Sequence, residues 1–300
     1  AAGMGEGTGD DHVSVLVDEV VKFLQPASGR IYVDGTLGLG GHSRAILDAS
    51  APDGRVIGFD WDEEAIALAR RRLAPYGDRL RIVRANYADL VAGLAGEGIM
   101  AVHGLVLDLG VSSLQLDRAG RGFSFQVDAP LDMRMDLRLP ETAAQLIARL
   151  SAEELADIFY NYGEERQSRR IAAHLVEARK NQPVTTTRQL AEIVARAIPR
   201  RFHPPSIHVA TRVFQALRIA VNRELNNLVK VLAEAPSVLV PGARMCVLTF
   251  HSLEDRIVKQ AFAGSRDYKV VTRKPVAPGR QEVLKNPRAR SAKLRVVERV

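Results

Sequence analysis

Short apolar runs alternate with helical patterns over residues 30 to 110. Four of these runs are typical of buried strands. The segment 63–73 between two of them places its apolar residues at helical spacing. Strands that alternate with helices predict βαβ units and a mostly parallel sheet. The predicted strands are 30–34, 56–60, 80–84 and 104–108.

The pattern changes between about residues 141 and 236, where almost every segment is helical. Ser151 and Glu154 have the spacing of a capping box, which predicts a helix start. Further helices are expected after Gly163, over about 187–199, and as one longer helix over about 209–235, before strand patterns resume at 244–250, 268–273 and 294–298. A helical block between strand-rich halves predicts an insertion. We expect a discontinuous α/β domain of 12–117 and 210–300, an inserted helical domain of 118–209 and a flexible leader of 1–11.

The segment RGFSFQVDAPLDMRMD, residues 121–136, follows neither period. Pro130 and the glycines at 120 and 122 mark it as a loop. A long loop is usually functional or disordered, and large apolar and charged side chains do not indicate disorder. Two interpretations stay open: a wall between a functional site and the insertion, or a structural hinge packed by its Met and Phe residues.

Composition excludes several classes of protein. The chain has 300 residues, of which 46% are hydrophobic, and this is ample for a sizeable core. The single cysteine, Cys246, lies in an apolar run and excludes a disulfide framework or a Cys-rich zinc site. The sequence has no apolar run of about 18 residues and starts with an acidic, Gly-rich segment. We therefore expect a cytoplasmic protein with no membrane segment.

The net charge of +7 is concentrated near the C-terminus. Residues 265–300 contain 11 Lys or Arg and three Asp or Glu, so this stretch carries +8 and the remaining 264 residues sum to −1. A basic stretch on a nearly neutral body indicates a phosphate-rich partner. A solvated basic tail is the alternative.

The first predicted strand leads into a glycine-rich loop, VDGTLGLGGHS at 33–43. Glycines at 38, 40 and 41 let the backbone approach a ligand at a helix N-terminus. Asp60 ends the second strand, 22 residues after Gly38, where a carboxylate can accept hydrogen bonds from a ribose diol. This arrangement predicts an adenosine-containing cofactor, although a simple tight turn would also use glycines. Ser43 replaces the third glycine of a dinucleotide loop, which disfavours NAD.

Polar residues also follow two later strands, at the sheet edge where α/β proteins bind ligands. Asp108 begins DLGVSSLQLD after the fourth strand, and His251 lies in TFHSLEDR after the fifth. Asp108 can receive a proton or hold an amine, or it can cap the next turn. A lone histidine such as His251 is more often a hydrogen-bonded packing residue than a catalyst. Together these positions predict one functional rim.

Eight blocks of the chain, in the same order, resemble the RsmH/MraW family of ribosomal RNA methyltransferases. The resemblance implies a class I S-adenosylmethionine-dependent methyltransferase with a Rossmann-like, mostly parallel seven-stranded sheet and an inserted all-helical domain. It also implies methylation of the N4 of a cytosine in the P-site part of the 16S rRNA decoding region. Among the blocks are VDGTLGLGGHSRAIL at 33–47, LDLGVSS at 107–113, RGFSF and PLDMRMD within 121–136, YGEER at 162–166, FHSLEDRIVK at 250–259 and NPRARSAKLRV at 286–296.

The resemblance also implies a set of cofactor contacts. Two positions depart from the family pattern: Tyr87 stands where Phe is more frequent, and Leu114 stands where Pro is usual. Tyr87 keeps the stacking surface and adds a hydroxyl that needs a partner. The implied cofactor residues are Gly40, Gly41, His42, Asp60, Tyr87, Asp108 and Gln115.

Cytosine N4 is a poor nucleophile because its lone pair is delocalised into the ring. An enzyme must place N4 in line with the sulfonium methyl group and accept a proton. We expect Asp108, with Ser112 and Ser113, to hold the amino group, and His251 to be the alternative acceptor. Asp108 could instead bind only the cofactor's ammonium group. No metal is required.

A base in folded RNA must be unstacked and held by aromatic or guanidinium groups, while cations hold the backbone. We expect 16S rRNA in the small ribosomal subunit as the partner. A dinucleotide-dependent oxidoreductase and a non-catalytic subunit assembly factor are the rival functions, and a homodimer stays open. The expected base contacts are Arg121, Phe123, Phe125, Met133 and Arg134, and the expected backbone contacts are Arg288, Arg290 and Lys293.

Overall fold

The sheet identifies the fold of the protein. The computed structural model describes residues 13–111 and 120–300. Within them, seven strands form one sheet in the order β3-β2-β1-β4-β5-β7-β6. Strands β1 to β5 are parallel, and β7 runs antiparallel to both β5 and β6. This arrangement confirms the class I methyltransferase fold. The strands are β1 (Ile31–Asp34), β2 (Arg55–Asp60), β3 (Leu80–Arg84), β4 (Val102–Asp108), β5 (Leu239–Thr249), β6 (Tyr268–Val270) and β7 (Lys293–Arg299).

Helices cover both faces of the sheet because successive strand residues point to opposite sides. Val33 and Leu105 pack on the face covered by α4 (Leu90–Gly96), α11 (Glu224–Glu234) and α12 (Ser252–Gly264). Tyr32 and Val106 pack on the face covered by α1 (Val17–Leu24) and α2 (Gly41–Ala49). Among the described residues, no helix is long and apolar enough to cross a membrane.

Shorter elements complete this sheet unit. Helix α3 (Glu63–Arg72) follows β2 and packs Ala69 beside Leu37 and Leu73. The remaining elements are the helix α13 (Arg280–Lys285) and the 3-10 turns η1 (Ala74–Arg79), η2 (Tyr87–Asp89), η4 (Ala235–Ser237) and η5 (Pro287–Ser291).

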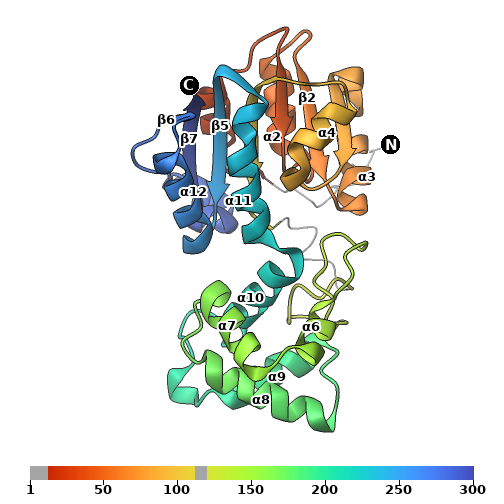
Figure 1. Cartoon of the computed structure of the whole chain (residues 1–300), viewed down its shortest axis with the longest axis vertical. Helices are drawn as coiled ribbons and strands as arrows, with labels where there is room; N and C mark the ends of the chain where they lie inside the picture. Colours follow the sequence, from red (N-terminus) through yellow and green to blue (C-terminus); the bar gives the residue numbers. More distant parts are fainter. Residues whose placement is uncertain (1–12, 112–119) are drawn as a thin grey trace, which may run out of the picture.

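A separate helical unit lies below the sheet unit in the view of Figure 1. Its core is one hydrophobic cluster in which Phe159, Leu175 and Leu190 are fully buried. The capping box predicted at Ser151 and Glu154 is confirmed at the start of α7. The unit consists of α6 (Ala143–Arg149), α7 (Ala152–Gly163), α8 (Ser168–Asn181), α9 (Thr187–Ala197), η3 (Arg200–Phe202) and α10 (Thr211–Asn222).

The single long helix expected over 209–235 was wrong. The helix is interrupted at Arg223, which adopts a left-handed conformation with φ 51°. Helix α10 ends before this residue and α11 begins after it. Helix α10 contributes Val213 and Leu217 to the helical core, whereas α11 packs on the sheet. The sequence analysis placed the end of the helical domain at residue 209. Helix α10, which follows this boundary, packs with the helical unit instead.

Residues 120–136, called the connector, precede the helical unit along the chain. A backbone hydrogen bond joins the two ends of this loop. Met133 N donates to the carbonyl oxygen of Arg121 at 2.9 Å. Gly122 has φ +74°, and a Cβ atom there would overlap the carbonyl oxygen of Pro130. Phe123 and Met133 are buried in the helical core. The sequence of the connector lacks periodicity because a loop, rather than a helix or strand, inserts these side chains into the core. This packing agrees with the interpretation of the segment as a structural hinge.

Candidate functional site

A cavity of about 380 Å³ lies at the carboxyl ends of β1, β2, β4 and β5. The sheet unit supplies the glycine-rich loop, and α10 and α11 supply the facing wall through Gln215, Arg218 and Glu224. The connector adds Met135. Among the sequence-predicted residues, the lining contains Gly40, Gly41, His42, Asp60, Tyr87, Asp108, His251 and Arg288.

The loop after β1 is bound to the end of β2. Gly38 N donates to Asp60 Oδ2 at 2.9 Å, and Asp62 N donates to Oδ1 at 2.9 Å. Gly38 and Gly40 both have positive φ, which glycine adopts without steric cost. Burial raises the pKa of Asp60 to about 6, against the opposing effect of these two N–H groups.

Asp108 lies at the end of β4 beside a buried histidine. Its backbone N–H donates to Thr36 Oγ1 at 2.7 Å, and its Oδ1 accepts from Gly110 N at 2.9 Å. Oδ2 is 3.7 Å from His42 Nδ1. Burial raises the pKa of Asp108, and the nearby His42 acts in the opposite direction. A carboxyl group with a raised pKa is a better proton acceptor than an exposed one.

Ser43, which replaces the third glycine of a dinucleotide loop, binds a second buried carboxylate. Its Oγ donates to Asp34 Oδ2 at 2.7 Å, and Thr36 N donates to Oδ1 at 3.1 Å. Asp34 is 1% exposed, and burial raises its pKa. Ser43 therefore satisfies a buried acceptor of the loop.

His251 caps the N-terminus of α12. Its Nδ1 accepts a long hydrogen bond of 3.4 Å from Glu254 N. Its Nε2 lies 3.3 Å from Glu254 Oε2, although no hydrogen bond joins them. With the Nδ1 lone pair directed at the helix, the neutral ring carries its proton on Nε2. This geometry fits a hydrogen-bond donor better than the proton acceptor considered from the sequence.

Glu254 and the facing wall were missed by the sequence patterns. Glu254 is 3% exposed, lines the cavity, and accepts from Phe250 N through Oε1 at 2.9 Å. Arg218 Nε donates to Glu224 Oε2 at 2.9 Å across the break between α10 and α11. The available signal was that Glu254 lies within the block FHSLEDRIVK, whereas Glu224 lay inside the single helix expected over about 209–235.

The five connector residues expected to hold a base do not line the cavity. Met133 is fully buried and Phe123 is 7% exposed, so the helical core occupies the surfaces that a base would need. Phe125 contacts the ring of Phe214, with centroids 4.9 Å apart. Arg134 forms an ion pair with Asp132 at 2.8 Å, and Arg121 pairs with acids of the sheet unit. Met133 and Phe123 are therefore core residues rather than base contacts, whereas base contacts by Phe125, Arg121 and Arg134 stay a prediction.

The basic C-terminal residues lie beside the cavity mouth or on the nearby surface. Arg288, Arg290 and Lys293 are exposed. The same region fastens the N-terminal segment that covers the glycine loop: Leu16 N donates to Glu282 Oε2 at 2.8 Å, and Asn286 Nδ2 donates to Val13 O at 2.9 Å. Ser112, Ser113 and Gln115 lie outside the described residues.

The cavity has the size and chemistry to hold an adenosine-containing cofactor. Its volume is within the range of ligand pockets. The carboxylate of Asp60 can receive ribose hydroxyls, the backbone at Gly40 and Gly41 can approach a charged tail, and Tyr87 offers an aromatic face. Asp108 lines the same cavity and presents a carboxylate to it.

Comparisons with known proteins agree with this assignment. Residues 10–300 match the family model described as the MraW methylase family. A protein of Desulfotalea psychrophila is 59% identical over 289 residues, covering 96% of this chain and 98% of the relative. Proteins of Geotalea uraniireducens and a Cyanothece strain are 51% and 52% identical, and each alignment covers 96% of this chain and at least 95% of the relative. All three relatives are named ribosomal RNA small subunit methyltransferase H.

Proposed function

The chain belongs to the MraW methylase family and is an S-adenosylmethionine-dependent rRNA methyltransferase, and we propose that its target is the N4 of a cytosine in the P-site region of 16S rRNA. The proposed substrate is a cytosine within the small ribosomal subunit, which places the reaction in the cytoplasm. A homodimer stays a prediction, which sedimentation would test.

The half-buried carboxylate of Asp108 in the cavity is the observation that best supports this proposal. S-adenosylmethionine supplies an electrophilic methyl group when it is bound. The N4 nitrogen forms a bond to the methyl carbon as the carbon–sulfur bond breaks, and N4 then gives up a proton. Asp108 accepts that proton in this proposal, and burial helps because it raises the pKa of the carboxyl group.

Other groups of the cavity fit the edge of cytosine. Cytosine presents an amino donor at N4 and acceptors at N3 and O2. Glu254 and His251 line the cavity together with Asp108. Nε2 of His251 is buried 3.3 Å from Glu254 Oε2, so it would donate to a base only after the ring turned away from Glu254. We assign His251 to holding the base and Asp108 to accepting the proton. Binding of the cofactor's ammonium group remains the alternative role of Asp108.

Incubation with unmethylated small subunits and labelled S-adenosylmethionine tests the reaction. Nucleoside mass spectrometry should find N4-methylcytidine at a single position, and the Asp108→Asn variant should produce little. A label at cytosine C5, or on another base, would reject the N4 assignment. Binding to the subunit without methyl transfer would instead support a non-catalytic assembly factor. Titration with NADH tests the third function, because only a dinucleotide-dependent oxidoreductase should bind this cofactor.

A further inference from the structure

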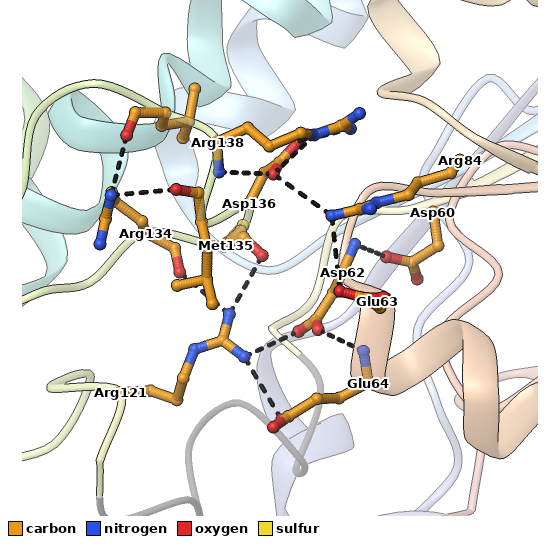
Figure 2. A network of polar contacts seen from close by, with 12 residues as sticks. Asp60, Asp62, Glu63, Glu64, Arg84, Arg121, Arg134, Met135, Asp136 and Arg138 are labelled. Carbon is orange, nitrogen blue, oxygen red and sulfur yellow. Dashed lines mark hydrogen bonds and ion pairs between the residues drawn. The ribbon is translucent and has the colours of Figure 1, made fainter.

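Arg121 of the connector reaches the sheet unit with one end of its guanidinium group and binds the connector's own backbone with the other (Figure 2). Nη1 lies 3.3 Å from Asp62 Oδ2 and 3.5 Å from Glu64 Oε2. Nη2 donates to the carbonyl oxygens of Arg134 and Met135, each at 3.0 Å. The Arg121 side chain is 12% exposed and that of Asp62 is 3% exposed, so solvent screens this pair little.

Asp62 connects this ion pair to the cofactor site. Its Oδ1 caps α3 by accepting from Glu64 N at 3.0 Å, while its own N–H donates to Asp60 Oδ1 at 2.9 Å. One residue therefore separates Arg121 from the carboxylate assigned to the ribose. Asp60 and Met135 line the cavity, whereas Arg121 and Asp62 do not.

A second ion-pair bridge joins the sheet unit to the connector. Arg84 lies beside Asp60 in the backbone pairing of β3 with β2, but its side-chain ion pairs do not include Asp60. Arg84 Nη2 lies 3.9 Å from Glu63 Oε2 and 3.9 Å from Asp136 Oδ1 (Figure 2). The Arg84 side chain is 37% exposed, so its contribution is weaker. Loss of Arg84 loosens the contact between the units without disturbing the turn from Asp60 to Asp62.

The shape of the guanidinium group makes Arg121 specific. Its two terminal nitrogens are held apart in one plane, so one reaches a carboxylate of the sheet unit while the other reaches two carbonyl oxygens of the connector. The single nitrogen of a lysine does not span both sets of partners. Its Nε is buried without a hydrogen-bond partner among the described residues, so these terminal contacts hold the side chain in place. The turn that carries Asp60 is thus fixed against the connector.

We propose that Arg121 is a positioning residue of the cofactor site, which holds the turn from Asp60 to Asp62 against the carbonyl oxygens of Arg134 and Met135. Cofactor affinity then depends on a residue that does not touch the cofactor. The helical unit, through the connector, contributes to cofactor binding even in the absence of RNA.

Isothermal titration of the full-length protein with S-adenosylhomocysteine tests this proposal. We expect the dissociation constant to rise about tenfold in Arg121→Ala and less in Arg121→Lys. Asp62→Asn should also weaken binding, because asparagine keeps the Oδ1 that caps α3 but replaces the oxygen that faces Arg121. Its effect should not exceed that of Arg121→Ala, since Arg121 keeps its 3.5 Å contact with Glu64 Oε2. The double variant should bind no more weakly than Arg121→Ala, because Arg121→Ala already breaks the ion pair with Asp62 that Asp62→Asn removes.

Arg84→Ala is the matched control, since it removes the other bridge between the units. We expect its dissociation constant to stay within about twofold of the wild type, with circular dichroism confirming that all variants are folded. The proposal is overturned if Arg121→Ala also stays within twofold, if Arg84→Ala weakens binding as much as Arg121→Ala does, or if the effects of Arg121→Ala and Asp62→Asn add.

Discussion

Nδ1 of His42 lies 3.7 Å from Oδ2 of Asp108, and the other ring nitrogen, Nε2, donates to the carbonyl oxygen of Val15 at 2.8 Å. The backbone contact leaves the Nδ1 lone pair of the neutral ring on the side of Asp108. A proton that Asp108 accepts therefore has a second basic atom nearby. The glycine-rich loop thus places a second ionisable group beside Asp108, and we expect it to assist the proposed proton transfer.

Replacement of Asp108 tests its role as acceptor. Asp108→Asn should lower kcat by roughly 10²–10⁴-fold, because the amide cannot take the N4 proton. The dissociation constant for S-adenosylmethionine should change much less. Single-turnover methylation and calorimetric titration measure the two effects. A variant that methylates at the wild-type rate would rule out the acceptor role, and a large loss of cofactor affinity would favour the ammonium-binding alternative.

Cofactor binding should weaken in mild acid because of Asp60. Burial raises the pKa of this carboxyl group to about 6, so it becomes protonated below that pH and loses its charge-assisted hydrogen bonds to the ribose. We expect the dissociation constant for S-adenosylhomocysteine to be constant above about pH 7 and to rise below pH 6.

Two controls separate this local effect from unfolding. A carboxyl group whose folded pKa is raised binds its proton more tightly in the folded state. The contribution of Asp60 to folding stability is therefore largest below its unfolded pKa and is lost as the pH rises through 6. Acid should thus weaken binding without Asp60 lowering the melting temperature. In Asp60→Asn the affinity should be low, and the part of its pH dependence due to Asp60 should disappear.

The connector should be intolerant of a side chain at Gly122. A Cβ atom there would overlap the backbone of Pro130 and Asp132, and its φ of +74° is unfavourable for other residues. Gly122→Ala should lower the free energy of unfolding by about 1–3 kcal/mol. Gly120→Ala is the control, because nothing lies within 4 Å of its Cβ position. Equal denaturation midpoints for the two variants would contradict this account.

The exposed cations near the cavity mouth should bind RNA through its phosphates. Replacing Arg288, Arg290 and Lys293 with Gln should weaken binding to 16S rRNA and reduce the dependence of affinity on salt, by up to about 0.7 per lost contact with a single strand. Lys293 also lies 3.7 Å from Asp255, so this acid should offset part of its effect. The same change at the exposed Arg70 and Arg71 on α3 should leave the salt dependence unaltered.

Local signals in the sequence predicted local structure well. Ser151 and Glu154 formed their capping box, and β3 covers the residues that its apolar run indicated. The break at Arg223 was missed because an arginine in a left-handed conformation leaves no glycine or proline as a mark. The helix ends where the side chain of Asn222 binds the connector, so tertiary contacts rather than local propensity mark this end.

Parts of the site that depend on distant contacts were beyond the reach of sequence patterns. The rim of β1, β2 and β4 was predicted because parallel strands place their carboxyl ends at one edge. The facing wall of Arg218 and Glu224 comes from a helix break that no pattern indicated. Met133 was taken for a ligand contact because a loop can insert a core residue without any periodicity.

Asn222 joins the segment that enters the helical unit to the helix by which the chain leaves it. Its side chain accepts from Met135 N at 2.8 Å and donates to Met133 O at 2.9 Å, so the exit from α10 is tied to the incoming connector. A segment whose two ends are held together adds little loop-closure entropy to the domain that carries it. The helical unit has the layout of an exchangeable module, through which one methyl-transfer scaffold could be fitted to another RNA.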